Sequence, residues 1–441
     1  MLARSLGATA LTFVFVFPAV TFAQTPAPPP KEVAGIPVNY DEAQVGTYTL
    51  PDPLLLANGK RVRDAKTWYA KRRPEIVRLF EENQFGRSPG APTDVTYDRF
   101  DKGTAAFDGT AIRTQTTIYF SRDRAAGPKM NLLVYLPAKA QKPVPMLLNI
   151  GFSSNAAVVN DPGVAEGEVW NKDHKKVPGK QGMAIGKIDV APLIHAGFGF
   201  AAVYYGDIEP DFEGGLPYGV RALYLKPGQT QPAPDEWGAI AAWGWGLSRV
   251  MDYLEKDPGI DSKRVALYGA SRLGKTVLWT AARDTRFAAV IACCSGEGGA
   301  SLSRRNYGET IAHLTAPSRF PYQFCANYAK YAQHVDQFPV DANMLIALIA
   351  PRPLLLQTGD SDYWSDPKGE FLAAKAAGPV YALLGGQGFE ATEWPPAGIA
   401  VPGLLSYFMH SGGHGTLPTD WVQFLKFLEI QLGEPKPAPH S

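Results

Sequence analysis

The order of apolar and polar positions along the chain predicts a mixed sheet. Residues 111–120 and 130–136 alternate between apolar and polar side chains, which is typical of strands with one face in water. At residues 146–150 the apolar run is nearly continuous, as it is in central strands that are covered on both faces. We therefore expect an antiparallel edge that leads into a mostly parallel sheet.

Further along, apolar runs alternate with segments in which apolar residues recur at helical spacing. This alternation indicates a doubly wound α/β fold, a three-layer αβα sandwich with a mostly parallel central sheet. The expected strands cover residues 198–205, 265–269, 288–293, 353–357 and 380–384, and the expected helices cover residues 64–85, 235–255, 272–283 and 421–432. We expect Pro74 to open a second segment of the first helix and Asp235 to cap the second helix.

Residues 265–276 have three interpretations. An apolar run ends in Gly-Ala-Ser at Ser271, and a helix-compatible segment follows at once. Hydrolases of the α/β class expose a nucleophilic serine on such an elbow, although Gly274 comes one residue later than in their usual pattern. The same letters match a phosphate-binding loop, in which Lys275 would hold phosphate and Thr276 magnesium. In the third interpretation Ser271 is only a helix N-cap.

A serine nucleophile needs a histidine that accepts its proton. In α/β-hydrolases this histidine follows the serine and the acid in the chain. His414 lies in a Gly-Gly-His-Gly turn directly before the last expected helix, which makes it the preferred base. His410 is the weaker candidate.

The acid that orients the histidine is expected just past the strand at residues 353–357. Asp360 and Asp362 both follow this strand. Asp362 is preferred, because a short loop lets its side chain turn back toward the histidine. Glu297, after the preceding strand, is the competing carboxylate.

Two other loops are candidates for the site. Gly151 and Phe152 follow the strand at residues 146–150, where a hydrolase has a second oxyanion-hole amide; an ordinary strand-end turn is the alternative. The long loops at residues 155–187 and 206–234 are expected to be functional, because long ordered loops in compact domains usually are.

The first residues indicate export. Residues 1–23 combine an early arginine, an apolar stretch and a small-residue cleavage site, as in a secretory signal peptide. We expect a Pro-rich linker or N-terminal extension at residues 24–45, one catalytic domain at residues 46–433 and a disordered tail at residues 434–441. A periplasmic or secreted location would keep the protein from ATP, which weakens the phosphate-loop interpretation.

Composition and charge limit the kinds of molecule that we expect the protein to bind. The 441 residues carry a formal net charge of +1 and no basic stripe, so nucleic acid is not an expected partner. No later stretch is apolar enough to span a membrane, and we expect a soluble monomer. The three cysteines, Cys293, Cys294 and Cys325, have no metal-binding spacing, so no metal or cofactor is expected. Buried thiols are favoured over a bridge to Cys325.

Together these residues resemble the glucuronoyl esterases, carbohydrate esterase family 15, over roughly residues 50 to 430. The motifs that carry the resemblance are Gly269-x-Ser271-Arg272-x-Gly274-Lys275, Ser295-Gly-x-Gly-Gly299, Arg304-Arg305-Asn306, residues 345–353, Asp362-x-Trp364-Ser365-Asp366-Pro367, and Gly413-His414 with Asp420-Trp421. The resemblance implies an α/β-hydrolase fold and a serine esterase that needs no metal. Its implied substrate is the ester between a 4-O-methyl-glucuronoyl group of xylan and a lignin alcohol.

The resemblance also implies roles for single residues. Ser271 would be the nucleophile and His414 the base, while Arg272 lines the oxyanion hole. On the sugar side, Lys275 would contact hydroxyls, Trp364 would close over the uronate ring, and Glu309 would reach its hydroxyls.

One position departs from the family pattern. Many relatives have a glutamate just before the Ser-Gly-x-Gly-Gly stretch, and here Cys294 takes its place. A thiol cannot replace a carboxylate, so the acid must come from elsewhere, and Asp362 matches an alternative position of bacterial relatives. Two other interpretations stay open, namely an acetyl-xylan or broader carbohydrate esterase with the same triad, and a carbohydrate-binding protein whose triad has decayed.

Overall fold

The structure, a computed structural model, describes residues 29–125, 127–180 and 186–433. The expected signal peptide at residues 1–23, the first part of the linker and the tail at residues 434–441 lie outside the described residues. None of the described helices combines the length and the apolar character that a membrane span requires.

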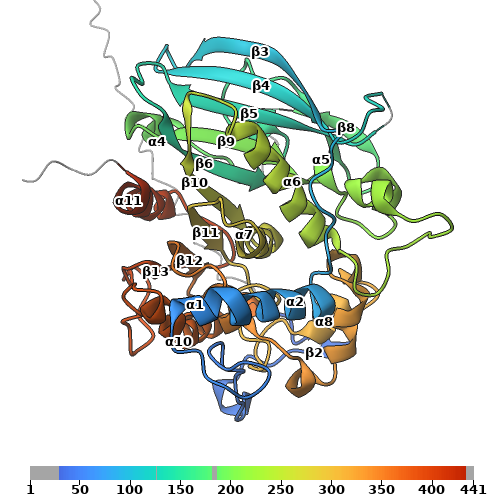
Figure 1. Cartoon of the computed structure of the whole chain (residues 1–441), viewed down its shortest axis with the longest axis vertical. Coiled ribbons are helices and arrows are strands. Elements are labelled where there is room, and N and C mark those ends of the chain that lie inside the picture. Colours follow the sequence, from blue (N-terminus) through green and yellow to red (C-terminus); the bar gives the residue numbers. More distant parts are fainter. Residues whose placement is uncertain (1–28, 126, 181–185, 434–441) are drawn as a thin grey trace, which may run out of the picture.

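A nine-stranded sheet forms the centre of the molecule (Figure 1). Its strand order is β13-β12-β11-β10-β6-β9-β5-β4-β3. The strands are β3 (Thr96–Ala106), β4 (Ala111–Tyr119), β5 (Lys129–Pro137), β6 (Val144–Gly151), β9 (Gly199–Tyr204), β10 (Ile260–Ala270), β11 (Ala289–Cys293), β12 (Leu354–Gly359) and β13 (Leu405–His410). Two small hairpins add β1 (Glu32–Val33) with β2 (Ile36–Pro37), and β7 (Gly167–Trp170) with β8 (Lys176–Gly179).

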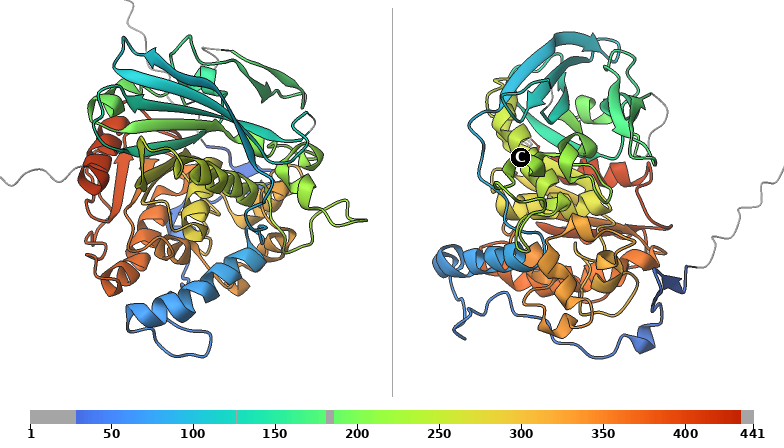
Figure 2. Two further views of the ribbon diagram at one scale, coloured as in Figure 1. Left: turned by 45° about the horizontal axis from the view of Figure 1, so that its top comes forward. Right: turned by 90° about the vertical axis from the view of Figure 1, so that its right-hand side faces the viewer.

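The sheet has the predicted mixed character. From β13 to β9 all neighbouring strands are parallel, whereas β9, β5, β4 and β3 pair antiparallel. In Figure 2 the antiparallel strands, in cyan and teal, rise above the orange and red helices of the C-terminal half. The carboxyl ends of the parallel strands share one edge of the sheet, which is where open α/β sheets bind ligands.

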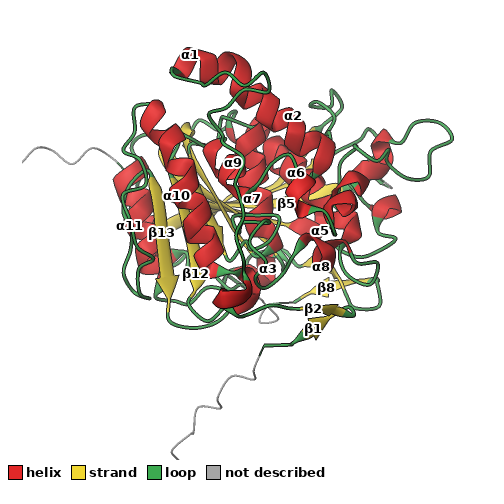
Figure 3. Ribbon diagram, turned by 90° about the horizontal axis from the view of Figure 1, so that it is seen from below, coloured by secondary structure: helices red, strands yellow, loops and turns green. Residues whose placement is uncertain are grey.

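Helices cover both faces of the sheet and complete three layers (Figure 3). On one face α6, α7, α9 and α10 contribute to the larger apolar core, and on the other face α3, α4 and α11 contribute to the second core. The helices are α1 (Ala65–Thr67), α2 (Arg73–Asn83), α3 (Asn155–Val158), α4 (Ala191–His195), α5 (Tyr205–Ile208), α6 (Ala239–Leu254), α7 (Arg272–Arg283), α8 (Ile311–Thr315), α9 (Ala342–Ala347), α10 (Pro367–Leu383) and α11 (Asp420–Leu432). The α/β sandwich predicted from the alternation is confirmed.

The expected strand at residues 380–384 is wrong. These residues end α10, whose buried positions Phe371, Ala374, Ala377 and Tyr381 recur at helical spacing. A short apolar run does not by itself distinguish a strand from the buried face of a helix. The last strand of the sheet is instead β13, which the apolar pattern did not identify.

The expected N-cap of the 235–255 helix is also wrong. Helix α6 begins at Ala239, and its N-cap is Gly238. Asp235 lies earlier and pairs with Arg87 at 2.8 Å. By contrast, Pro74 lies in the first turn of α2, as predicted for the second helical segment.

Candidate active site

Ser271 occupies a strained elbow between β10 and α7. Its backbone has φ 58° and ψ −128°, and its side chain makes no capping hydrogen bond to the helix. A positive φ at a residue other than glycine costs about 1–3 kcal/mol and is retained mainly at functional sites. A side-chain N-cap is therefore absent, and the strained turn has the shape of the elbow in the hydrolase interpretation.

Close packing explains why the second glycine of the motif is at Gly274. A Cβ at Gly274 would lie 2.8 Å from the backbone oxygen of Cys293. The backbone N–H of Ser271 donates to the same oxygen at 2.8 Å. The first turn of α7 is thus held tightly against β11, and only glycine fits there.

The phosphate-loop interpretation does not fit the structure. The side chain of Lys275 is 6% exposed, and its Nζ lies 3.9 Å from Oε2 of Glu309. Thr276 is fully buried, and its hydroxyl donates to the backbone oxygen of Arg272 at 2.9 Å. The Thr276 hydroxyl is therefore closed off from the magnesium ion that a phosphate-binding loop requires.

His414 and Asp362, the residues predicted as base and acid, lie in contact. Nδ1 of His414 lies 2.7 Å from Oδ2 of Asp362. The carboxylate side chain is 3% exposed, whereas the imidazole is 46% exposed. Ser365 Oγ lies 3.2 Å from the same Nδ1. A buried acceptor at Nδ1 fixes the tautomer that leaves Nε2 free to accept a proton.

His414 lies in the loop between β13 and α11, which we call the histidine loop. This loop is held against the end of β12. Oδ1 of Asp360 accepts a hydrogen bond from the backbone N–H of Gly412 at 2.9 Å, so this carboxylate anchors the loop. A Cβ at Gly359 would lie only 2.2 Å from the backbone oxygen of Gly413. Glycine at the end of β12 is therefore needed for the close approach of the histidine loop.

Glu297, the competing acid, has other partners. Its Oε1 accepts hydrogen bonds from the hydroxyls of Ser303 at 2.7 Å and Tyr328 at 2.8 Å. Burial raises the pKa of Glu297 to about 8 and so favours the neutral form of this carboxyl group. A protonated carboxyl group cannot stabilise an imidazolium ion, which leaves Asp362 as the better acid.

Cys294 fastens the histidine loop from the other side. Its Sγ accepts a hydrogen bond from the backbone N–H of Gly415 at 3.3 Å and donates to the oxygen of the same residue at 3.2 Å. Burial, followed by the charge of Asp362, raises the pKa of this thiol well above its usual value. All three cysteines are free and buried, as predicted.

Cys294, Asp362 and His414 have donor atoms within 4.8 Å of one another, and among the described residues they form the only cluster of three such side chains. Asp362 and His414 already share a hydrogen bond. A metal ion there would occupy Nδ1 and break that bond, so metal binding and the acid–base pair exclude each other.

His410 is a structural residue. It is buried, with Nδ1 2.8 Å from Oδ2 of Asp420 and Nε2 3.0 Å from the backbone oxygen of Gly413. These contacts link the start of α11 to the histidine loop. Both ring nitrogens are occupied, which supports His414 over His410 as the base.

Arg272, the first residue of α7, is anchored by Asp211. Its guanidinium group forms an ion pair with Oδ2 of Asp211 and lies over the ring of Phe320, 4.6 Å from the ring centroid. Asp211 also accepts hydrogen bonds from the hydroxyls of Tyr205 and Tyr322, at 3.1 and 3.0 Å. The backbone N–H of Arg272 is in the first helical turn, where no intrahelical partner exists.

The predicted sugar-binding residues gather beside this elbow. Lys275 faces Glu309, and Glu309 also pairs with Arg319 at 3.2 Å. The Arg319 guanidinium lies 5.6 Å from the ring centroid of Trp364. Burial lowers the pKa of Lys275, while the nearby charge of Glu309 opposes this shift. Lys275 and Glu309 are thus buried, while Arg319 is partly exposed beside the ring of Trp364.

The loop after β6 lies at the carboxyl end of the strand beside β10. Gly151 ends β6, which pairs in parallel with β10. The ring of Phe152 packs edge-to-face on that of Tyr205, with ring centroids 5.4 Å apart. Gly151 and Phe152 remain candidates for a second oxyanion-hole amide.

Sequence reasoning missed Asp211 and Arg319. Asp211 falls in the long loop at residues 206–234, which was expected to be functional, but no local pattern marked this residue. Arg319 lies 10 residues after Glu309 in a segment without a motif. Their roles depend on contacts between segments that are far apart in the chain.

Comparison with known proteins agrees with the resemblance seen in the sequence. A family model described as "Glucuronyl esterase, fungi" matches residues 232–385. A carbohydrate esterase named MZ0003, from an unknown prokaryotic organism, is 43% identical over 403 residues, which are 89% of this chain and 92% of that protein. The 4-O-methyl-glucuronoyl methylesterase of Podospora anserina is 26% identical over 326 residues, which are 71% of this chain and 56% of that protein.

The structure of a glucuronoyl esterase from Solibacter usitatus is also similar. It matches with a TM-score of 0.85 and 46% identity, covering 89% of this chain and 100% of that chain. Both the identity and the coverage are too high for a likeness of fold alone. The chain therefore belongs to the glucuronoyl esterases of carbohydrate esterase family 15, which are carboxylic ester hydrolases with an α/β-hydrolase fold.

Proposed function

We propose that this protein is an exported serine esterase that cleaves esters of D-glucuronic acid or of its 4-O-methyl ether, such as lignin–glucuronoxylan cross-links. The observation that carries the proposal is the 2.7 Å contact between His414 and Asp362, at the sheet edge where the strained Ser271 follows β10. The names of the relatives supply the substrate class, because they are glucuronoyl esterases and a 4-O-methyl-glucuronoyl methylesterase.

The first half of the reaction forms an acyl-enzyme. Asp362 accepts the Nδ1 proton of His414 in a hydrogen bond, so Nε2 takes the hydroxyl proton of Ser271 as its oxygen attacks the ester carbonyl. Negative charge then develops on the carbonyl oxygen and is stabilised by the backbone N–H of Arg272. The alcohol leaves with the proton from Nε2, and the uronate acyl group stays on Ser271.

The second half releases the acid. Water gives a proton to Nε2 of His414 and attacks the acyl carbonyl, and Ser271 recovers its proton as the bond breaks. The Arg272 guanidinium is largely neutralised by Asp211. The main role of the Arg272 guanidinium is thus to provide oriented hydrogen-bond donors rather than free positive charge.

The sugar side of the site explains the preference for a uronate ester. An esterified carboxyl group is neutral, so the ring must be oriented through its hydroxyls. Lys275 and Arg319 are donors, Glu309 is an acceptor, and Trp364 offers an apolar face. Charged groups make hydrogen bonds about twice as strong as neutral groups do, which suits recognition of a polyol.

The test compares wild type with Ser271→Ala on benzyl glucuronate, methyl galacturonate and an aryl acetate. We expect wild type to cleave benzyl glucuronate with the highest kcat/KM, and Ser271→Ala to lose nearly all activity on all three esters. Cleavage of the acetate alone would contradict the uronate specificity and favour a broader carbohydrate esterase. Equal rates for the variant and wild type would contradict the nucleophile.

A further inference from the structure

The N-terminal strap, defined as residues 32–44, lies against the loop that carries Glu309. The strap consists of the β1–β2 hairpin and a short 3-10 turn at Glu42–Gln44. The backbone oxygen of Asn39 accepts a hydrogen bond from the N–H of Gly308 at 2.8 Å, and the Asn39 side-chain amide donates to the backbone oxygen of Asn306 at 2.6 Å. The extension expected as a linker is thus hydrogen-bonded at Asn39 to the loop that precedes Glu309.

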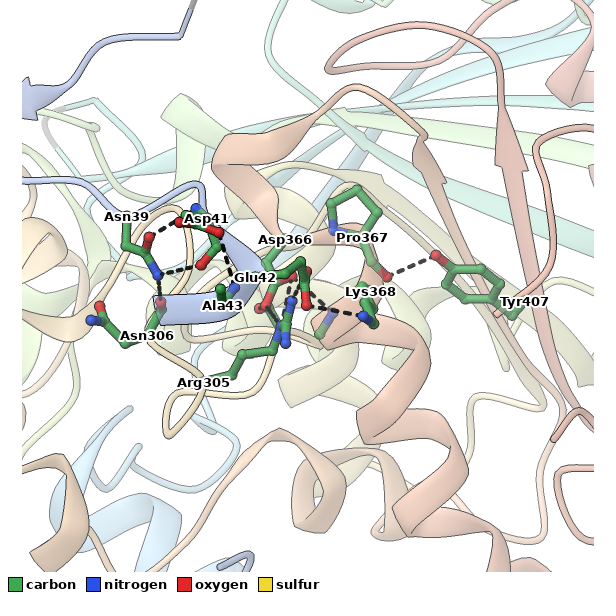
Figure 4. A network of polar contacts seen from close by, with 12 residues as sticks. Asn39, Asp41, Glu42, Ala43, Arg305, Asn306, Asp366, Pro367, Lys368 and Tyr407 are labelled. Carbon is green, nitrogen blue, oxygen red and sulfur yellow. Dashed lines mark hydrogen bonds and ion pairs between the residues drawn. The ribbon is translucent and has the colours of Figure 1, made fainter. Parts of the chain in front are cut away.

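An ion-pair network fastens the strap to two segments of the site (Figure 4). Glu42 pairs with Arg305 and, at 2.9 Å, with Lys368. Arg305 also pairs with Asp366 at 2.9 Å, and both side chains are buried. Asp366 caps α10 and follows Trp364 by two residues. The network therefore links the strap to the loops of both Glu309 and Trp364.

These two loops also touch each other. The backbone N–H of Glu309 donates to the oxygen of Trp364 at 2.9 Å. A Cβ at Gly308 would lie 2.5 Å from the backbone oxygen of Tyr363, so the contact is close. A shift of the strap would consequently move Glu309 and Trp364 together.

Tyr40 lies in the strap next to Asn39 but takes no part in the ion-pair network. Its ring packs edge-to-face on Tyr307, with centroids 6.0 Å apart. Its hydroxyl is buried and has no hydrogen-bond partner among the described residues. Burial raises the pKa of Tyr40, and the charges of Asp362 and Glu309 add to that shift. The phenol therefore lies in the field of both the proposed triad acid and a proposed sugar-binding residue.

We propose that the N-terminal strap is part of the sugar-binding half of the active site. Tyr40 supplies a hydroxyl that bonds a ring hydroxyl or ether oxygen of the uronate, and the Glu42–Arg305–Asp366 clamp positions the loops of Glu309 and Trp364 around it. A buried hydroxyl without a partner is unfavourable by itself, and a sugar oxygen is a partner of matching chemistry. The Tyr40 oxygen is shielded in the free enzyme, so this bond requires a shift of the neighbouring loops when the ring enters.

This inference rests on the proposed function, because it assigns residues that bind the same substrate. Tyr40→Phe removes one oxygen and keeps the ring. We expect it to raise KM for benzyl glucuronate about fivefold to tenfold, the usual effect of one lost hydrogen bond. Its kcat, and its rate on an aryl acetate that has no sugar, should stay near wild type. The matched control is Tyr218→Phe, an exposed tyrosine outside the site.

The clamp is tested by Glu42→Gln, which we expect to raise KM for benzyl glucuronate but not for the acetate. Glu82→Gln, which removes a surface ion pair with Arg78, is its control. Wild-type KM in a folded Tyr40→Phe enzyme would overturn the role of Tyr40. Equal losses on both esters would also overturn it, because they indicate a general structural effect.

A binding measurement separates failure of this inference from failure of the proposed function. Calorimetry measures the affinity for methyl glucuronate of two inactive proteins, Ser271→Ala and the Ser271→Ala, Tyr40→Phe double variant. Because neither protein is expected to cleave the ester, the measurement reports binding alone. The expected result is affinity that is fivefold to tenfold weaker for the double variant. Equal affinity contradicts the inference, whatever the hydrolysis assays show. If wild type fails to cleave benzyl glucuronate, the proposed function fails by itself.

Discussion

At the scale of single residues, the choice of the triad acid is the most informative feature. The position at which many relatives have a glutamate is Cys294 here, and its thiol instead bonds the backbone of Gly415. Asp362, in the loop after β12, contacts His414 at 2.7 Å. The carboxylate that contacts His414 thus comes from the loop after β12 rather than from the residue that follows β11.

The first prediction compares the two carboxylates. Asp362→Asn should lower kcat by roughly three to four orders of magnitude, because the histidine tautomer is no longer fixed. Glu297→Gln should have a far smaller effect, because Glu297 bonds Ser303 and Tyr328 instead. Steady-state kinetics on benzyl glucuronate provides the measurement, and the reverse ranking would identify the wrong acid.

The second prediction concerns Asp211, which holds Arg272 through an ion pair and is itself held by two tyrosine hydroxyls. Asp211→Asn should lower kcat at least tenfold, but less than the roughly hundredfold to thousandfold loss typical of removing an oxyanion donor. KM should change little, because the lost orientation acts on the transition state. A rise in KM at constant kcat would place Arg272 on the substrate-binding side instead.

The third prediction is a pH dependence of stability that arises at Glu297. Burial raises its pKa from 4.5 to about 8, so between these values the folded state binds more protons than the unfolded state. The free energy of unfolding should therefore fall as pH rises through this window, by about a few kcal/mol at most from this residue. Glu297→Gln cannot ionise, so its Tm should fall less between pH 5 and pH 8 than that of wild type. Identical pH slopes would contradict this expectation.

At the scale of secondary-structure elements, the site is assembled where the ends of β10, β11, β12 and β13 meet. Each strand ends in a residue or loop of the site, namely Ser271, Cys294, Asp362 and His414. The parallel pairing of neighbouring strands brings these ends to one edge. Close contacts at glycines then set the distances between the loops.

The fourth prediction tests one of these contacts. Gly359→Ala would place a Cβ 2.2 Å from the backbone oxygen of Gly413, so the histidine loop must move away from β12. We expect kcat to fall at least tenfold while circular dichroism stays native, since displacements of about 1 Å in a catalytic group can cost that much or more. Gly413→Ala is the matched control, because a Cβ there meets no atom within 4 Å. Equal activity in the two variants would contradict the contact.

At the scale of the whole molecule, the sequence predicted the class of fold and most of the site. Continuous apolar runs located β6, β10, β11 and β12, and positions relative to the expected strands and the last helix singled out Ser271, Asp362 and His414, of which the last two lie in contact. The pattern failed at residues 380–384, where a buried helix face resembles a strand. Asp211, Arg319 and the strap had no local signal, because their contacts join segments that are distant in the chain.

The fifth prediction is that no disulfide contributes to the stability of the described part of the chain. All three cysteines are free and buried. A reducing agent should therefore leave Tm unchanged, and titration of the denatured protein should find three thiols. A fall in Tm on reduction, or a count of one thiol, would reveal a bridge.

The central claim is that Ser271 is a nucleophile activated by His414. An organic fluorophosphonate reacts with a serine hydroxyl only when a neighbouring base activates it, so labelling followed by peptide mass spectrometry is the most direct test. The account predicts one phosphonate adduct, located on Ser271, which is lost in Ser271→Ala and formed far more slowly in His414→Ala. Absence of an adduct from folded wild-type protein, or an adduct on another residue, would contradict it.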